Sequence, residues 1–202
     1  RSTLFPYTTL FRSRDWAACN VGANSPEEYG DYFAWGETEG YMSGKKIFDW
    51  STYKYCMGSI STLTKYCSDS NYGYNGFTDN KTELDPEDDA ATVNWGQDWQ
   101  IPSDAQQKEL VNSNYTTIEW TTLNNVFGIK VTSNTNGNHI FLPAAGTVYG
   151  VVANPPAGFY MSRTSHGGYA VLSLYFHSDS IGRGSGYRSN ARSVRPVRKQ
   201  PK

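Results

Sequence analysis

Short alternations of apolar and polar residues recur through the second half of the chain. A period of two is the pattern of a half-buried strand, so these segments predict a series of β-strands joined by turns. The Asn-Gly pair within residues 135–138 suits the positive φ of a tight hairpin. The predicted strands are residues 117–120, 128–132, 139–142, 158–161, 169–177 and 192–198, with a short aromatic strand earlier, at residues 32–35.

Two helix starts precede this run of strands. Residues 85–89 read Asp-Pro-Glu-Asp-Asp, which predicts a short helix with Asp85 as its cap and acidic residues at the positive end of its dipole. Ser103, with Gln106 three residues later, predicts a capping box and a second helix. Two short helices followed by antiparallel strands predict an α+β fold. The second helix is expected to end near Asn112, with these residues facing inward: Ala105, Leu110 and Val111.

Residues 40–80 show little periodicity and are rich in Tyr, Ser, Gly and Lys. This composition predicts a long ordered loop region, of the kind that carries function or clasps a core. The whole chain has 15 Tyr, 6 Trp and 19 Gly, a composition typical of binding loops, because a tyrosine ring gives a large contact area at low entropic cost. The core is expected to be built on four tryptophans: Trp16, Trp35, Trp95 and Trp99.

Length and charge limit the possible functions. The 202 residues suffice for one domain with a sizeable core. A formal net charge of −1 gives no electrostatic basis for binding nucleic acid. No apolar run is long enough to cross a membrane. These features disfavour nucleic-acid-binding and membrane-spanning classes.

The first 13 residues stand apart from the rest. Residues 3–13 match the translation of a common short-read sequencing adapter. We therefore interpret residues 1–13 as a non-native segment and residues 14–199 as one domain, truncated at its N-terminus, from which any signal peptide has been lost. Deleting residues 1–13 should leave stability unchanged, although a β-prone segment can pair with an open strand edge beside residues 193–197.

Cysteines and acidic residues leave two alternatives open. Cys56 and Cys67 flank a hairpin-like stretch, and a disulfide between them and two free thiols are equally compatible with the sequence. Cys19 is expected to be a buried apolar residue. The acidic residues 85–89 could bind calcium, but they lack the spacing of a calcium loop, and helix capping explains them without a metal. We predict no metal and no cofactor.

Six short motifs follow one another along nearly the whole domain. They are Trp-Ala-Ala-Cys-Asn-Val-Gly-Ala at residues 16–23, Glu-Tyr-Gly-Asp-Tyr-Phe-Ala-Trp-Gly-Glu at 28–37, Leu-Asp-Pro-Glu-Asp-Asp-Ala-Ala at 84–91, Trp-Gln-Ile-Pro-Ser at 99–103, Phe-Leu-Pro-Ala-Ala-Gly at 141–146 and Ser-Val-Arg-Pro-Val at 193–197. Together they resemble the Fibrobacter succinogenes major paralogous domain of Bacteroidetes surface proteins. That family is similar to C-type lectins, to the formylglycine-generating enzyme and to the variable proteins of diversity-generating retroelements. The resemblance implies a C-type lectin-like fold and a recognition module of a surface protein, secreted protein or lipoprotein.

This chain departs from the family pattern in ways that limit its chemistry. Gln100 and Gln106 stand where Arg and Glu are usual, so a neutral hydrogen bond at best replaces a salt bridge at this junction. The related enzymes need a late pair of cysteines, and this chain has none after Cys67, so we predict that it is not an enzyme. The Glu-Pro-Asn and Gln-Pro-Asp triplets of calcium-dependent, sugar-binding lectins are also absent.

The resemblance also implies a position for the ligand. In the retroelement proteins the variable residues cluster in the C-terminal segment, which corresponds here to residues 163–168 and 177–188. We expect a protein or glycan ligand at the cell surface, contacted by polar groups and aromatic anchors. The predicted ligand-binding residues are Tyr149, Tyr160, Arg163, Ser165, His166, His177, Asp179, Arg183, Tyr187 and Arg188.

Other interpretations of these late segments remain. Residues 163–168 and 177–188 can be ordinary solvated loops, and the domain is then a structural module of a larger surface assembly without its own ligand. An enzyme related to the formylglycine-generating group comes third. No nucleophile-elbow motif accompanies the three histidines. The glycine-rich residues 179–192 are interpreted as a loop leading into the last strand, since no helix follows that would make a phosphate site.

Overall fold

A computed structural model describes residues 7–10, 14–149, 151–152 and 156–200 of the chain. Over these residues the protein is mostly β-sheet. It has two short α-helices, α1 (Ala90–Trp95) and α2 (Asp104–Leu110), and two 3-10 turns, η1 (Tyr74–Gly76) and η2 (Pro86–Asp88). This content agrees with the predicted α+β class. Among the described residues, no helix has the length and apolar character needed to cross a bilayer.

The largest sheet is built from the late part of the chain. Its strands run in the order β13–β12–β11–β14–β3, and β8 also pairs with β11. Strands β11, β12 and β13 form an antiparallel meander, and β14 joins parallel to β11 and antiparallel to β3. The strands are β3 (Tyr32–Phe33), β8 (Ala145–Gly146), β11 (Ala157–His166), β12 (Ala170–His177), β13 (Ser180–Tyr187) and β14 (Arg192–Ser193).

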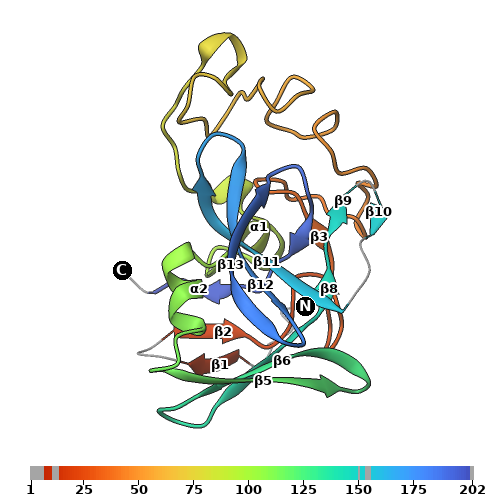
Figure 1. Ribbon diagram of the computed structural model, residues 1–202, viewed down its shortest axis with the longest axis vertical. Helices are drawn as coiled ribbons and strands as arrows, with labels where there is room; N and C mark the ends of the chain where they lie inside the picture. The colour runs from red at the N-terminus through yellow and green to blue at the C-terminus, as the bar shows by residue number, and fades with distance from the viewer. Residues whose placement is uncertain (1–6, 11–13, 150, 153–155, 201–202) are drawn as a thin grey trace.

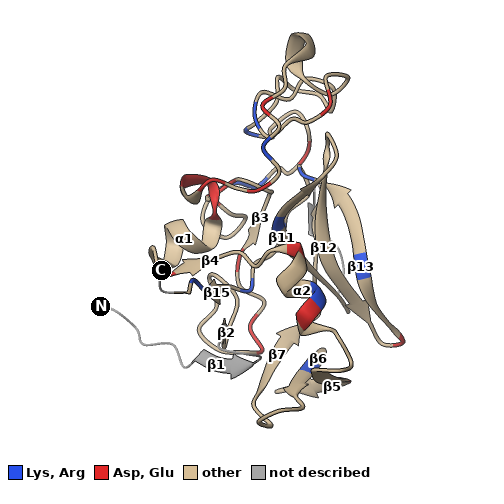
Figure 2. Cartoon of the chain, turned by 90° about the vertical axis from the view of Figure 1, so that its left-hand side faces the viewer, with Lys and Arg blue, Asp and Glu red and all other residues tan. Residues whose placement is uncertain are grey.

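Smaller sheets flank the largest one. Figure 1 shows the β5–β6–β7 sheet at one end of the molecule and residues 40–80 at the other, and Figure 2 shows the same arrangement from the side. The remaining strands are β1 (Tyr7–Leu10), β2 (Arg14–Ala17), β15 (Val197–Arg198) and β4 (Trp99–Gln100) in one sheet, β5 (Thr116–Leu123), β6 (Val126–Ser133) and β7 (His139–Pro143) in another, and the hairpin of β9 (Val148–Tyr149) and β10 (Val151–Val152).

Two clusters of buried side chains hold these layers together. One joins the early segments and residues 40–80 to the largest sheet, and it fully buries Trp35, Phe48 and Tyr66. The other packs Leu110 of α2 and Phe176 of β12 against the β5–β6–β7 sheet. Residues 40–80 therefore belong to the core on one side, as expected of a loop region that clasps it.

The second helix begins as predicted. Ser103 Oγ accepts a hydrogen bond from the Gln106 amide at 3.3 Å, and Gln106 Oε1 accepts one from the Ser103 amide at 2.7 Å. The inward face differs from the prediction, because Ala105 is exposed and Gln107 is buried. Gln107 Nε2 donates to the main-chain oxygen of Tyr160 at 2.9 Å, so a polar tether replaces an apolar contact.

The predicted cap of the first helix was wrong. Asp85 precedes η2 and makes no side-chain cap hydrogen bond, whereas Asp89 caps α1 by accepting from the Thr92 amide at 3.0 Å. The Asp89 carboxylate also accepts from the Ile101 amide at 2.9 Å. This contact with the residue after β4 favours Asp89, because one buried carboxylate satisfies amides from two segments of the chain.

The predicted loop over residues 179–192 was wrong for most of its length. Residues 180–187 form β13, which pairs with β12 from Ser180 opposite His177 to Tyr187 opposite Ala170. Three alternating glycines lower the strand propensity of this segment, and so they hide it in the sequence. Pairing with β12 along its full length outweighs that propensity.

Two of the four tryptophans expected in the core lie there. Trp16 and Trp35 are buried. Trp95 and Trp99 are half-buried and contact each other edge to face, with ring centres 5.4 Å apart. The prediction was wrong for this second pair, whose short helix and strand lie close to the surface.

The structure decides between the two alternatives for the cysteines. All three cysteines are free thiols, so no Cys56–Cys67 disulfide forms, and Cys19 is buried as expected. The Cys56 thiol donates to the Trp50 main-chain oxygen at 3.0 Å.

Residues 7–10 pair with β2 and not with the edge beside residues 193–197, because β2 itself pairs with β15.

Candidate functional site

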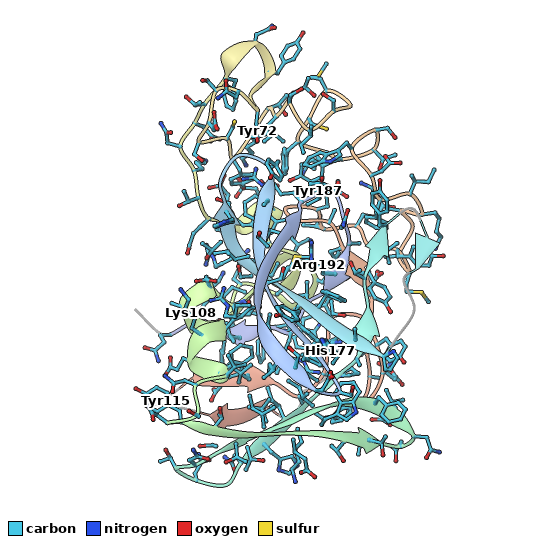
Figure 3. All side chains as sticks on the ribbon, in the orientation of Figure 1. Tyr72, Lys108, Tyr115, His177, Tyr187 and Arg192 are labelled. Carbon is cyan, nitrogen blue, oxygen red and sulfur yellow. The ribbon has the colours of Figure 1, made fainter. Side chains whose placement is uncertain are left out.

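The predicted ligand-binding residues do not form one surface. Strands β12 and β13 pair from His177 opposite Ser180 to Ala170 opposite Tyr187. At about 3.3 Å per residue, the two ends of this hairpin lie roughly 23 Å apart. Figure 3 shows Tyr187 and His177 toward opposite ends of the sheet. His166, which ends β11, lies opposite Ala170 and so belongs to the Tyr187 end.

Three of the predicted contacts lie inside the protein and correct the prediction. Tyr160, Ser165 and Arg188 are 2%, 9% and 0% exposed. The Tyr160 hydroxyl donates to the Pro143 main-chain oxygen at 2.9 Å and accepts from Asn20 Nδ2 at 3.2 Å. Burial raises the pKa of Tyr160 to about 12. These side chains hold the sheet to its surroundings and cannot reach a ligand on the surface.

Two predicted arginines are half-buried and already paired. Arg163 lies 3.3 Å from Glu83 and donates to Gln100 Oε1 at 2.7 Å. Gln100 therefore accepts a hydrogen bond from a charged arginine at this junction. Arg183 pairs with Asp104 at the start of α2. Both arginines join elements of the fold, and neither is a free polar group for a ligand.

The other five predicted residues are exposed but scattered. His177 Nδ1 lies 2.6 Å from Asp179 Oδ1 in the β12–β13 turn. Tyr149 is 59% exposed on β9, a separate hairpin. His166 and Tyr187 remain at the opposite end of the largest sheet from His177.

A row of four aromatic rings covers the Tyr187 end of the sheet, and we call it the aromatic row. Tyr187 of β13 contacts Trp50 at 5.9 Å and Tyr169 at 5.7 Å between ring centres. Tyr169 in turn contacts Tyr72 at 4.8 Å. Tyr187 is 43% exposed, and the other three rings are half-buried. Two of these contacts are edge to face, and the Tyr72–Tyr169 contact is tilted. Such contacts hold the rings in place and leave part of the row open to solvent.

Arg188, which follows Tyr187 in the chain, is fully buried and links the segments of the aromatic row to the core. Its Nη1 donates to the Tyr66 main-chain oxygen at 2.7 Å, its Nη2 to Gly167 at 3.0 Å and its Nε to Ala170 at 3.3 Å. The guanidinium also stacks on Trp35, 4.7 Å from the ring centre. Because these partners come from residues 40–80, from the β11–β12 turn and from β12, one side chain ties together the segments that present the row.

A buried carboxylate holds residues 40–80 from the other side. Asp88 Oδ2 accepts a hydrogen bond from the Tyr66 hydroxyl at 2.6 Å, and Tyr55 donates to Asp88 Oδ1. Lys65 Nζ lies 2.6 Å from Asp88 Oδ2. Burial alone would raise the pKa of Asp88, but the hydrogen bonds from Lys65, Tyr55 and Tyr66 outweigh it and lower the pKa to about 2. Asp88 is thus a charged anchor for the loop region.

The same lysine occupies the acidic cluster considered for calcium. Asp85, Glu87 and Asp88 bring carboxylate oxygens within 4.8 Å of one another. Lys65 Nζ lies 2.8 Å from Asp85, 2.6 Å from Asp88 and 3.9 Å from Glu87. An ammonium group already balances these carboxylates, so this geometry favours an ion-pair network over a metal site.

Sequence reasoning missed three of the four residues of the aromatic row. Trp50 and Tyr72 lie in residues 40–80, and Tyr169 begins a predicted strand. The available signal was the aromatic richness of residues 40–80, which identified a candidate region but no partner for it. Tyr187 is the one predicted residue that the structure brings into the row.

Comparison of the chain with protein-family models, with curated proteins and with solved structures gives no match in any of the three. The family resemblance therefore rests on the six sequence motifs alone. The candidate site rests on its own geometry.

Proposed function

We propose that this domain is a non-catalytic ligand-recognition module of a bacterial surface or secreted protein. It binds a protein or a glycan through the aromatic row. The observation that carries the proposal is that Trp50, Tyr72, Tyr169 and Tyr187, from distant parts of the chain, converge on one partly exposed surface. Held aromatic rings suit recognition, because they offer contact area with little entropy left to lose on binding.

A C-type lectin-like fold is part of this proposal. The helices come early and the antiparallel meander comes late, and β15 near the C-terminus pairs with β2 near the start of the domain. This order of elements is the plan that the family resemblance implies.

The non-catalytic part of the proposal rests on the chemistry of the thiols. Cysteine acts as a nucleophile through its thiolate. Burial raises the pKa of the Cys19 and Cys56 thiols, which disfavours their thiolates. All three cysteines are free, and each lies before residue 68 in the chain.

A structural module without its own ligand is the alternative function. Exposed apolar side chains on residues 40–80 favour it, since Ile47 and Met57 are 54% and 63% exposed. Such side chains would be covered in a larger surface assembly. The two functions differ in whether the isolated domain binds a partner other than its neighbours in that assembly.

The test is to probe the purified, fluorescently labelled domain on a glycan array and on an array of bacterial and host surface proteins. Saturable binding to a defined set of spots, lost when Trp50 and Tyr187 are both changed to Ala, is the expected result. An intact domain that binds no spot on either array favours the structural module. Binding that survives the double substitution places the site elsewhere on the domain.

A further inference from the structure

Three buried arginines lie close together near the end of the chain, and they are not equivalent. Arg188 donates hydrogen bonds from all three of its guanidinium nitrogens. Arg195 also uses all three, toward Asn20, the Ala17 and Ala18 oxygens and the Phe141 oxygen. Every guanidinium nitrogen of Arg188 and Arg195 is therefore engaged in holding other segments of the fold.

Arg192 is also buried, but only one of its guanidinium nitrogens makes hydrogen bonds. It is 5% exposed, and its Nη1 donates to the main-chain oxygens of Tyr187 at 3.0 Å and Asn190 at 3.2 Å. Within the described part of the chain, its Nε and Nη2 have no hydrogen-bond partner and no carboxylate pairs with it. Burial, with no opposing charge, lowers the pKa of Arg192 to about 10. A buried cation of this kind is costly unless something pairs with it.

The unsatisfied arginine lines a pocket. The pocket has a volume of about 90 Å³, several times the space that one water molecule needs. Its lining residues come from β11, β12, β13 and β14, and none of them belongs to the aromatic row. The lining residues are Phe159, Ser173, Tyr175, Gly184, Ser185 and Arg192.

A second unsatisfied group faces the same pocket. Ser173 is 5% exposed, and its Oγ has no hydrogen-bond partner. Phe159 lies directly across from Tyr175 in the β11–β12 pairing, so two half-buried aromatic rings flank these polar groups on one face of the sheet. One cation, one hydroxyl and two aromatic walls make a site for a small planar anion.

The glycines of β13 create the space for this arrangement. Gly182 and Gly184 lie opposite Tyr175 and Ser173 in the β12–β13 pairing. A Cβ at Gly182 would lie 2.8 Å from the Tyr175 hydroxyl oxygen, and one at Gly186 would collide with Arg192 Nη2. Side chains at these two positions would displace the tyrosine and the arginine. The glycines at alternate positions of β13 therefore leave room for the Tyr175 and Arg192 side chains. The pairing of β13 with β12 would not by itself require glycine there.

We propose that this pocket binds a carboxylate group, with Arg192 as the cation that pairs with it. A guanidinium offers a planar fork that matches a carboxylate, and a single cation balances a single negative charge. Arg192 is the one charged residue in the lining, so a phosphate dianion would remain half compensated. The carboxylate can belong to an acidic sugar or to a free small acid. This site is separate from the aromatic row, and its test does not depend on the ligand of the row.

The test is a two-dimensional NMR titration of the ¹⁵N-labelled protein with glucuronate, propionate, glucose and inorganic phosphate. Saturable shifts of the amides of residues 182–186 and 192 with either carboxylate, and none with glucose, are expected. Tighter binding of glucuronate than of propionate identifies an acidic sugar as the source, and the reverse identifies a small acid. The proposal is overturned if neither carboxylate saturates, if glucose matches them, or if phosphate binds more tightly than both.

Two variants check where the carboxylate binds. Arg192→Gln removes the cation and should abolish binding. Because this change also costs two main-chain hydrogen bonds, Gly184→Leu gives an independent check: its Cβ position lies 3.4 Å from Tyr175, an ordinary contact, and the rest of the side chain enters the pocket. Gly184→Leu should weaken carboxylate binding at least about tenfold, since it blocks the charge-assisted hydrogen bonds. Lys108→Gln, which removes an exposed cation on α2, should leave binding unchanged. Undiminished binding to Gly184→Leu would rule the pocket out.

Discussion

The two ends of the β12–β13 hairpin carry similar residues in different surroundings. At the loop-covered end, where Tyr169 and Tyr187 lie, residues 40–80 fold against the sheet and bring Trp50 and Tyr72 into contact with these rings. At the open end, residues 177–180, Asp179 has 82% of its side chain exposed and pairs with His177 in the same turn. A polar or aromatic residue near the end of the chain thus becomes part of an organised surface where a segment distant in sequence packs on it.

Substitution of Arg188 at the loop-covered end should cause the largest loss of stability. Arg188→Met leaves the main-chain oxygens of Tyr66, Gly167 and Ala170 without their charged donor, and should lower the free energy of unfolding by about 3 kcal/mol or more. Urea unfolding followed by tryptophan fluorescence measures this loss. Arg198→Met, at a half-exposed arginine of β15, is the control and should change it by no more than about 0.5 kcal/mol. Equal losses in the two variants would show that Arg188 is not the clamp of the loop-covered end.

Acid should weaken the loop-covered end through Asp88. The folded-state pKa of Asp88, about 2, lies below its ordinary value of 3.8. The unfolded chain therefore takes up this proton first as the pH falls. The stability from this carboxylate is fully present above about pH 4 and is lost between about pH 4 and pH 2, by about 2 kcal/mol in all.

Urea unfolding between pH 5 and pH 2 measures this effect. Asp88→Asn should lack this part of the pH dependence and should already be less stable at pH 5. Asp179→Asn, at the open end, is the matched control and should keep the wild-type slope. If wild type and Asp88→Asn lose stability in parallel, the ion-pair network around Lys65 does not anchor residues 40–80.

Substitutions at the open end should have the smallest effect on stability. His177→Ala combined with Asp179→Ala removes an exposed pair from a turn, and such changes usually alter stability by no more than about 0.5 kcal/mol. The melting temperature and the array binding pattern should both match the wild type. Loss of binding in this variant would move recognition to the open end and reverse the comparison.

Local signals in the sequence predicted a good part of the fold. The capping box of Ser103 and Gln106 and the strands β5, β6, β7, β11 and β12 depend on neighbouring residues, and a period of two or a cap is visible in the chain. Strand β13 was missed because its glycines lower its propensity, and its pairing with β12 decides its conformation. Asp89 replaces Asp85 as the helix cap for a similar reason, since its second partner, the Ile101 amide, lies 12 residues further along the chain.

The candidate site was less accessible to sequence reasoning. Arg188 and Tyr187 are neighbours in the chain, yet one is buried and the other is 43% exposed. Composition cannot distinguish them. The burial of Arg188 depends on main-chain oxygens that accept its hydrogen bonds, and one of these belongs to Tyr66, far away in the sequence. Likewise, the three arginines 188, 192 and 195 look alike in sequence, and their hydrogen-bond partners alone show which one is unsatisfied.

The most direct test of recognition at the loop-covered end compares two exposed tyrosines. Tyr187 is 43% exposed within the aromatic row, and Tyr149 is 59% exposed on the separate β9 hairpin. The binding of Tyr187→Ala and Tyr149→Ala is measured on the same glycan and protein arrays, after circular dichroism has confirmed that both variants fold. Our account predicts that Tyr187→Ala loses the spots bound by the wild type and that Tyr149→Ala retains them. Retention by Tyr187→Ala together with loss by Tyr149→Ala would contradict it.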